Sequence, residues 1–281
     1  MQSRTLILVI GFFCFGARLF AMQLEFLPQS RFFPLTFADP REIRMALLFD
    51  QQNRVNAYVG NYFSLISGKG EEEDSLAWVF GLEGAGYFAM RQNGATFPLE
   101  HTDGLIGVYA EVTQGIWRGQ LRFTHVSAHL SDGISGTSPI TYSREFLVGR
   151  VGVAPDKLKF AYLGAIVNVN SIPSLPAWSF QLGGHWFSSW NFARFTPFVA
   201  MDLKWKEEAS ANPSLSTQIG IALNNPPEAY RSFRLFYNFY TGADPRGQFY
   251  SLRYTSHALG IEMQILGASL TGGSCILGIL S

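Results

Sequence analysis

The chain has 281 residues, and its 21 lysines and arginines are balanced by 21 aspartates and glutamates, which gives no formal net charge. This balance gives no argument for a nucleic-acid partner, which would need a basic excess. Aromatic residues make up 15% of the chain and charged residues only 15%, an unusual composition for an ordinary soluble domain.

The first residues have the pattern of a secretory signal peptide. Arg4 precedes the apolar run TLILVIGFFCFG, and the small residue Ala21 stands at the expected cleavage position. The run is too short to cross a bilayer as an uncleaved anchor helix. We therefore predict export with removal of residues 1–21, and a periplasmic N-terminal segment over residues 22–41. Only Cys275 then remains, so no intrachain disulfide is expected.

The rest of the chain reads as a series of β-strands, because polar and apolar residues alternate with a period of two. The stretch IWRGQLRFTHV shows this most clearly. Its polar face carries Arg118, Gln120, Arg122 and Thr124. Its apolar face carries Trp117, Leu121 and Phe123. The strands are predicted near residues 42–50, 54–65, 76–92, 103–113, 116–130, 141–153, 157–169, 177–188, 193–205, 215–224, 230–241 and 248–265.

Short turns alternate with longer polar loops between these strands, as in outer-membrane barrels. The segment 67–74 departs from this pattern, since it is long where a short turn is expected. The sequence predicts an all-β, transmembrane antiparallel β-barrel of about twelve strands over residues 42–265, located in the bacterial outer membrane. Its expected partners are membrane lipids and the outer-membrane insertion machinery. Residues 266–281 follow as a tail without an assigned role. An exported β-sandwich or lipocalin-like barrel with an apolar interior would show the same alternation.

Several stretches resemble a bacterial family known as domain of unknown function 1207. They are FFPLTFADPRE at 32–42, THVSAHLSD at 124–132, SREFLVGR at 143–150 and YTGADPRGQFYS at 240–251. The chain departs from the family pattern at Ala128 and Ser131. The resemblance implies a bacterial envelope protein without an assigned activity.

Neither a metal nor a cofactor is predicted. His125 and His129 lie on one strand about 13 Å apart, which is too far to share one ion. The glycine-rich stretch at 81–86 lacks the spacing of a nucleotide-binding loop and lies within a strand.

The sharper chemical hypothesis is the pair His125-x-Ser127. On a strand both side chains share a face, with about 6.6 Å between their Cα atoms, so the imidazole can act as base to the hydroxyl. The pair resembles the His-x-Ser dyad of the outer-membrane phospholipase and lipid A deacylase, which need a third group to orient the histidine. If residue 127 pairs with residue 145, Glu145 supplies that group, whereas a one-residue shift would bring Arg144 instead.

Three functions remain open at this point. The polar side chains around His125 are also expected of a barrel rim that contacts the outer leaflet without any catalysis. The second function is a serine acyl hydrolase acting on phospholipid or lipid A. The third is a small-solute channel, because the predicted inner face carries Arg118, Gln120 and Arg122. The sequence does not decide whether the protein is an enzyme.

Overall fold

The computed structural model describes residues 22–29, 31–72, 74–190, 192, 194–206, 213–223 and 231–265. The predicted signal peptide, residues 1–21, and the predicted tail, residues 266–281, lie outside the described residues. Within the described part of the chain, no helix has the length and apolarity needed to cross a membrane.

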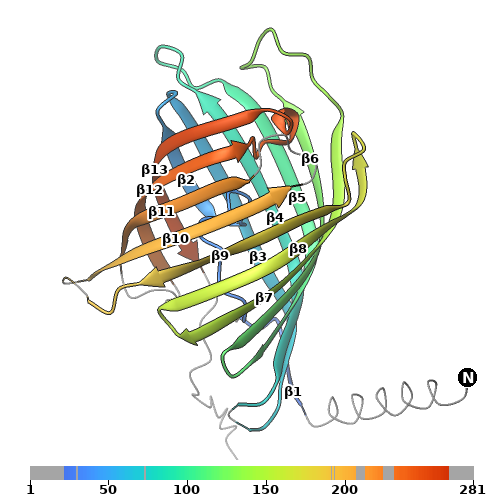
Figure 1. The fold of residues 1–281 in the computed structure, drawn as a ribbon, viewed down its shortest axis with the longest axis vertical. Helices are drawn as coiled ribbons and strands as arrows, with labels where there is room; N and C mark the ends of the chain where they lie inside the picture. Colours follow the sequence, from blue (N-terminus) through green and yellow to red (C-terminus); the bar gives the residue numbers. More distant parts are fainter. Residues whose placement is uncertain are drawn as a thin grey trace, which may run out of the picture.

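The described residues form one antiparallel sheet that closes into a barrel (Figure 1). Each strand pairs with its neighbours in the chain, and β13 pairs with β2 to complete the ring. The barrel strands are β2 (Met45–Asp50), β3 (Arg54–Lys69), β4 (Ala77–Arg91), β5 (Leu99–Gln114), β6 (Trp117–Leu130), β7 (Tyr142–Asp156), β8 (Lys159–Ile172), β9 (Trp178–Phe187), β10 (Phe195–Lys206), β11 (Ser214–Leu223), β12 (Arg231–Ala243) and β13 (Arg253–Ile265). The prediction of an all-β barrel of about twelve strands is therefore confirmed.

The two faces of the wall differ as the alternation predicted. In β6 the side chains of Gln120 and Arg122 are at most 5% exposed, whereas Trp117 and Leu121 on the opposite face are more than half exposed. The same holds around the ring, where buried polar and charged residues point inward and large apolar residues point outward. This distribution is the reverse of a lipocalin-like barrel, whose apolar residues would fill the interior.

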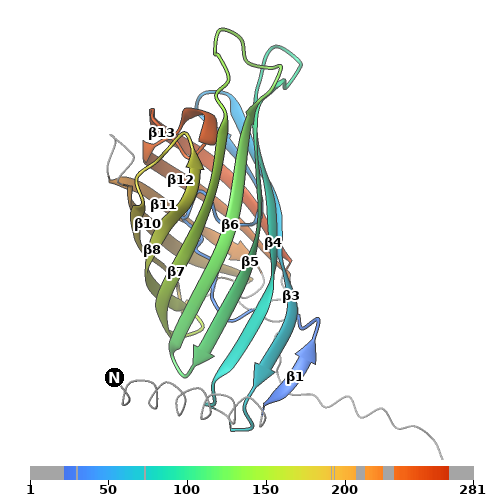
Figure 2. The same ribbon diagram turned by 90° about the vertical axis from the view of Figure 1, so that its right-hand side faces the viewer.

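The two ends of the barrel have different connections (Figure 2). At one end, called here the turn end, β5 and β6 are joined by residues 115–116, and β7 and β8 by residues 157–158. At the opposite loop end, residues 131–141 and 244–252 form longer connections. The link between β3 and β4, which the sequence analysis found too long for a turn, comprises residues 70–76 and lies at the turn end. Strand β3 reaches Lys69, beyond its predicted end at residue 65, through a bulge between Ser64 and Ile66.

Two elements were not predicted. Strand β1 (Gln23–Phe26) pairs with the last residues of β3 at the turn end. The 3₁₀ helix η1 (Gly247–Phe249) occupies the start of the strand predicted over 248–265, so β13 begins only at Arg253. The cause is local: Asp244 accepts a hydrogen bond from the backbone N–H of Arg246, and the turn so formed directs the chain across the loop end instead of along the wall.

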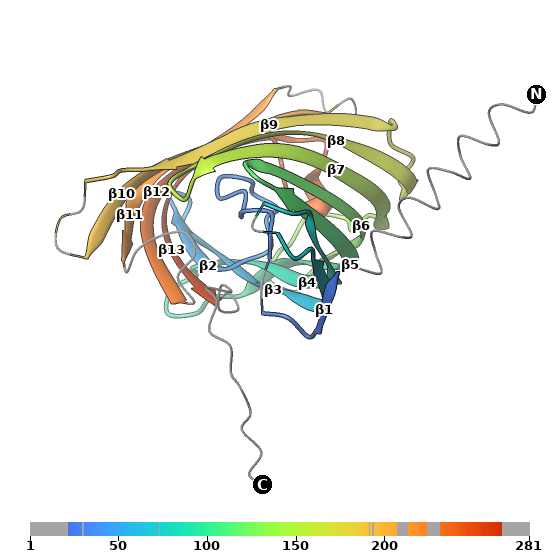
Figure 3. The same ribbon diagram turned by 90° about the horizontal axis from the view of Figure 1, so that it is seen from below.

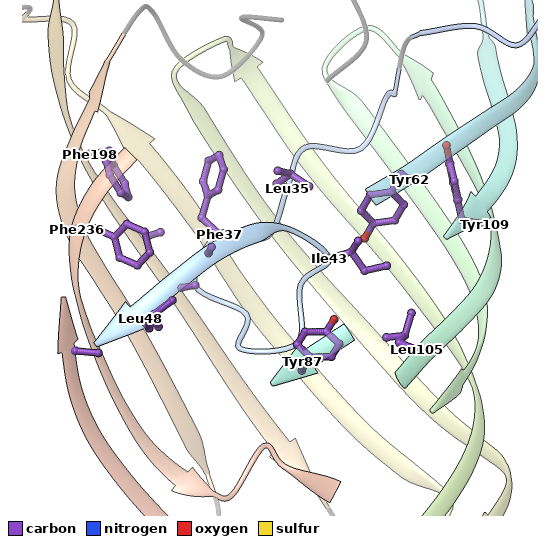
Figure 4. Packing of buried hydrophobic residues seen from close by; sticks show 14 of the residues in the cluster. Leu35, Phe37, Ile43, Leu48, Tyr62, Tyr87, Leu105, Tyr109, Phe198 and Phe236 are labelled. Atoms are coloured by element: carbon purple, nitrogen blue, oxygen red, sulfur yellow. The ribbon is translucent and has the colours of Figure 1, made fainter. Parts of the chain in front are cut away.

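Residues 31–44, named here the plug, lie inside the barrel (Figure 3). The sequence analysis placed residues 22–41 outside the barrel, but from residue 31 onward the chain fills the lumen. Phe33, Phe37 and Ile43 of the plug are 2–3% exposed. The Phe37 ring lies 6.3 Å from that of the β10 residue Phe198, measured between centroids. In Figure 4 Phe37 lies on the side of Phe198 and Phe236, and Ile43 on the side of Tyr62. The plug therefore supplies much of the apolar core that the strands alone lack.

Candidate active site on the outside of the barrel

His125 and Ser127 lie on the outer face of β6, on the same side as Leu121 and Phe123. The side chain of His125 is 42% exposed. Along this face the outward residues are apolar from the turn end to Phe123 and become polar from His125 toward the loop end. The pair thus stands where the apolar outer band gives way to the polar rim.

The structure brings Glu145 to His125. The predicted pairing of residues 127 and 145 is displaced by two positions, since Glu145 of β7 pairs with His125, and Ser127 pairs with Ser143. A shift of two residues keeps every side chain on its face, so Glu145 still points outward. Its Oε1 atom lies 2.6 Å from Nδ1 of His125. The alternative in which Arg144 takes this place does not occur.

A fourth residue, Asn170 of β8, supports the carboxylate. Its Nδ2 donates a hydrogen bond of 2.8 Å to Oε2 of Glu145, and the Ser143 hydroxyl lies 3.5 Å from Oε1. Asn170 reaches this position because a bulge between Glu145 and Phe146 shifts the pairing of β7 with β8. Sequence analysis missed Asn170, since its strand was predicted to end at residue 169 and nothing in the sequence marks the bulge.

Ser127 is on the correct face but is not bonded to the histidine. Its hydroxyl lies over Gly104 of β5, and within the described residues it forms no hydrogen bond. The Nε2 atom of His125 is likewise without a hydrogen-bond partner among those residues. Because Glu145 occupies Nδ1, a proton held there leaves Nε2 as the acceptor. A bond between Nε2 and the serine hydroxyl would complete a nucleophile, a base and an orienting carboxylate.

The lumen holds a second polar cluster, centred on the plug residue Asp39. Its carboxylate accepts hydrogen bonds from Arg150 of β7 at 3.0 Å, from Gln181 of β9 at 2.9 Å and from Lys204 of β10. Burial opposes ionisation of Asp39, but the positive charges of Lys204 and Arg150 outweigh it and hold its pKa below the usual range. Asp39, which lies in the stretch 32–42 that resembles the family pattern, thus anchors the plug to the barrel wall.

The pKa of a second plug carboxylate, Glu42, is lowered for a similar reason. Burial raises its pKa, and the nearby guanidinium groups of Arg150, Arg122 and Arg31 lower it by more, so the net shift is downward. Glu42 accepts hydrogen bonds from the backbone N–H of Thr36 at 3.0 Å and from the hydroxyl of Tyr62 at 2.6 Å. These bonds fix the bend of the plug within the lumen.

The histidines do not assemble a metal site. His129 points outward two residues beyond Ser127, His185 packs in the lumen against Phe37, and His257 contacts Tyr237 on the outer face. No cluster of three or more His, Cys, Asp or Glu side chains suited to a metal occurs within the described ranges.

The fold defines the class of this protein: it is a closed antiparallel β-barrel. The plug and buried charged residues fill its interior, and its exterior is largely apolar. The model of the family of proteins of unknown function DUF1207 matches residues 15–264, and the chain belongs to this family. The resemblance drawn from the sequence motifs is therefore confirmed. No curated protein and no solved structure matches the chain.

Proposed function

We propose that the barrel spans the bacterial outer membrane with its loop end outside. Closure pairs the backbone groups of the wall, as a bilayer interior requires. Exposed tryptophans mark two levels of the outer surface, as in the aromatic girdles of membrane barrels. Trp178 and Trp205 stand near the loop end, and Trp117 and Trp186 near the turn end. The outward residues between these levels are largely apolar.

Spin labels test this location. With the protein in lipid vesicles, a label at residue 121 should collide with oxygen dissolved in the bilayer, while a label at residue 122 should be shielded inside the barrel. High accessibility of the label at residue 121 to a water-soluble relaxation agent would contradict insertion. Recovery of the native protein in the soluble periplasmic fraction would do the same.

The function that the outer site supports best is hydrolysis of an acyl ester in a lipid of the outer leaflet. The contact of 2.6 Å between Nδ1 of His125 and Oε1 of Glu145 carries this proposal. It fixes the imidazole beside Ser127, at the border of the apolar band where the ester groups of a lipid would lie. In apo structures the bond between base and nucleophile is often long and tightens only with substrate.

The reaction would run in two steps. Ser127 Oγ attacks the acyl carbonyl as its proton passes to Nε2 of His125, and the ester C–O bond breaks as the leaving alcohol takes that proton. Water then attacks the acyl-serine with His125 again as base, which releases the fatty acid and restores the serine. Glu145 stabilises the imidazolium in both steps, and Asn170 holds Glu145.

The channel alternative is less well supported. The plug fills the lumen with buried side chains tied to the wall by ion pairs, among them Asp39 with Arg150 and Arg41 with Asp103. A solute would need the plug to move before it passed.

The hydrolase is tested with purified full chain in detergent micelles, given phosphatidylethanolamine or lipid A. Fatty acid release, measured by mass spectrometry, should fall by several orders of magnitude in Ser127→Ala. Glu145→Gln should retain part of the activity and shift its pH profile, because the imidazolium loses its counter-charge. His129→Ala serves as the matched control and should behave as the native chain, with heat-dependent gel migration showing a folded barrel in each case. Equal release by the native chain and Ser127→Ala would refute the proposal.

A further inference from the structure

The tetrapeptide Ala-Asp-Pro-Arg occurs twice in the chain, at 38–41 in the plug and at 243–246 after β12. Both copies adopt the same turn. The backbone N–H of Arg41 donates to Oδ1 of Asp39 at 2.8 Å, and that of Arg246 donates to Oδ1 of Asp244 at 2.9 Å. An aspartate followed by proline favours this turn, because its carboxylate accepts a bond from the residue two places on. In each copy the hydrogen bond to the aspartate fixes the backbone that carries the arginine.

The two turns meet at one cavity inside the barrel near the loop end. Both Arg41 and Arg246 line this cavity, whose volume is about 40 Å³. Asp103 of β5 joins the two turns, since its Oδ2 accepts hydrogen bonds from Nη1 of Arg41 at 2.6 Å and from the backbone N–H of Gly247 at 3.0 Å. Segments from opposite ends of the chain are therefore held around a single space.

The lining of the cavity is cationic. Three arginines contribute to it, Arg41, Arg44 and Arg246, whereas no aspartate or glutamate is among its described lining residues. Tyrosine rings hold two of the guanidinium groups, at 4.3 Å for Arg41 over Tyr87 and 5.0 Å for Arg246 over Tyr254. The carboxylates that pair with these arginines, Asp103, Glu262 and Asp244, are not among the described residues that line the cavity.

A buried histidine in the lining has unused hydrogen-bonding capacity. His101 is 2% exposed, and neither of its ring nitrogens has a hydrogen-bond partner. A carboxylate oxygen, Oδ1 of Asp103, lies 3.4 Å from Nε2 and is itself without a hydrogen-bond partner, whereas no carboxylate contact is recorded for Nδ1. The Nε atom of Arg44 is also buried and unpartnered. Buried polar groups are nearly always paired, so the unpartnered Nδ1 of His101 and Nε of Arg44 beside one cavity indicate a polar ligand.

We propose that this cavity binds a small oxyanion of the phosphate type, clamped between the two Ala-Asp-Pro-Arg turns. Arginine is the residue best suited to such groups, because its planar fork donates two hydrogen bonds to two oxygens. The volume corresponds to about three water molecules, which is the scale of one phosphate group. The site lies inside the wall, whereas His125 and Ser127 lie outside it, so this inference goes beyond the proposed hydrolysis and stands apart from it.

Isothermal titration calorimetry of the full chain in detergent at low salt tests the site, with inorganic phosphate as the probe. We expect saturable binding at one site, and a loss of affinity of about tenfold or more in Arg246→Gln, since a charged donor is removed. His101→Gln is a second variant, which replaces a lining residue of β5 without adding a charge to the cavity. Arg253→Gln is the matched control, because this exposed arginine stands at the same end but does not line the cavity.

Titration with glycerol 3-phosphate separates two sources of the ligand. Tighter binding of this compound than of inorganic phosphate would assign the site to a phosphomonoester, and the reverse order would assign it to the free ion. Absence of saturable binding to the native chain would overturn the proposal. Native affinity in both Arg246→Gln and His101→Gln would overturn it as well, provided that heat-dependent gel migration shows both barrels folded.

Discussion

Neutralising Asp39 is expected to release the plug from the barrel. In Asp39→Asn the side chain keeps its size, but Arg150 and Lys204 lose the only carboxylate to which each is paired among the described ion pairs. All three side chains are at most 8% exposed, so water does not replace the lost partner. The substitution leaves Arg150 and Lys204 buried without the carboxylate to which both donate hydrogen bonds.

The magnitude follows from this burial. Removing one partner of a buried ion pair costs about 3–5 kcal/mol, because the remaining charge stays desolvated. At about 1.4 kcal/mol per factor of ten, the equilibrium between the seated and displaced plug should shift by roughly two to four orders of magnitude. The twelve strands keep their pairing, so the barrel itself should remain closed as a sheet.

Two assays report on the plug without depending on any enzymatic activity. In planar bilayers the native chain should conduct little, while Asp39→Asn should open frequently and favour anions, because Arg150 and Lys204 then line the lumen. In a Cys275→Ser background, a cysteine at position 38 should react slowly with a water-soluble maleimide in the native plug, where Ala38 is 2% exposed. It should react much faster when combined with Asp39→Asn.

The matched control is Asp156→Asn, which removes a carboxylate from the exposed pair with Lys159 at the turn end. An exposed pair contributes little, so conductance and labelling should stay at native levels. If Asp39→Asn conducted and labelled no more than this control, the ion pairs would not hold the plug, and its apolar residues would have to do so alone.

Two further outcomes follow from the structure. The pKa of Asp39 is lowered from its usual 3.8 and that of Glu42 is lowered as well, so their stabilising effect is present above the unfolded values and is lost as pH falls through the folded ones. Bilayer conductance should therefore stay low between about pH 5 and 8 and rise only below about pH 4; opening near pH 6 would point to a histidine instead. Separately, Gly242→Ala should destabilise the barrel to urea by about 1–3 kcal/mol, because Gly242 has φ of +143° and an added Cβ would lie 2.4 Å from Cα of Ser214. Gly149→Ala, where nothing lies within 4 Å of the added atom, should unfold like the native chain.

Much of the barrel was predictable because its information is local. Period-two alternation assigns each residue to a face from its immediate neighbours, and this placed Arg122 inside and His125 and Ser127 outside before any pairing was known. Twelve predicted strands correspond to β2–β13, with differences mainly at their ends. The strand that began latest relative to its prediction, β13, starts five residues after position 248 because the turn at Asp244 precedes it, and alternation does not reveal such a turn.

The candidate site was predictable only in part. The alternation of faces along the strand predicted that Glu145 points outward. Its pairing with His125 depends on how the loop 131–141 closes, because a shift of two residues satisfies the alternation equally well. Asn170 joins the site through a bulge, which displaces the pairing without changing composition.

Which residues fill the lumen was determined by the tertiary structure alone. Asp39 and Arg41 stand in the segment that the sequence predicted to lie in the periplasm, and Glu42 stands at the start of the first predicted strand. Their partners come from strands far along the chain, such as Arg150 and Lys204 for Asp39. A charge in the lumen is stable only when an opposite charge meets it there, and that meeting exists only once the sheet has closed. The sequence by itself therefore determined the wall of this protein, whereas closure of the wall determined what fills it.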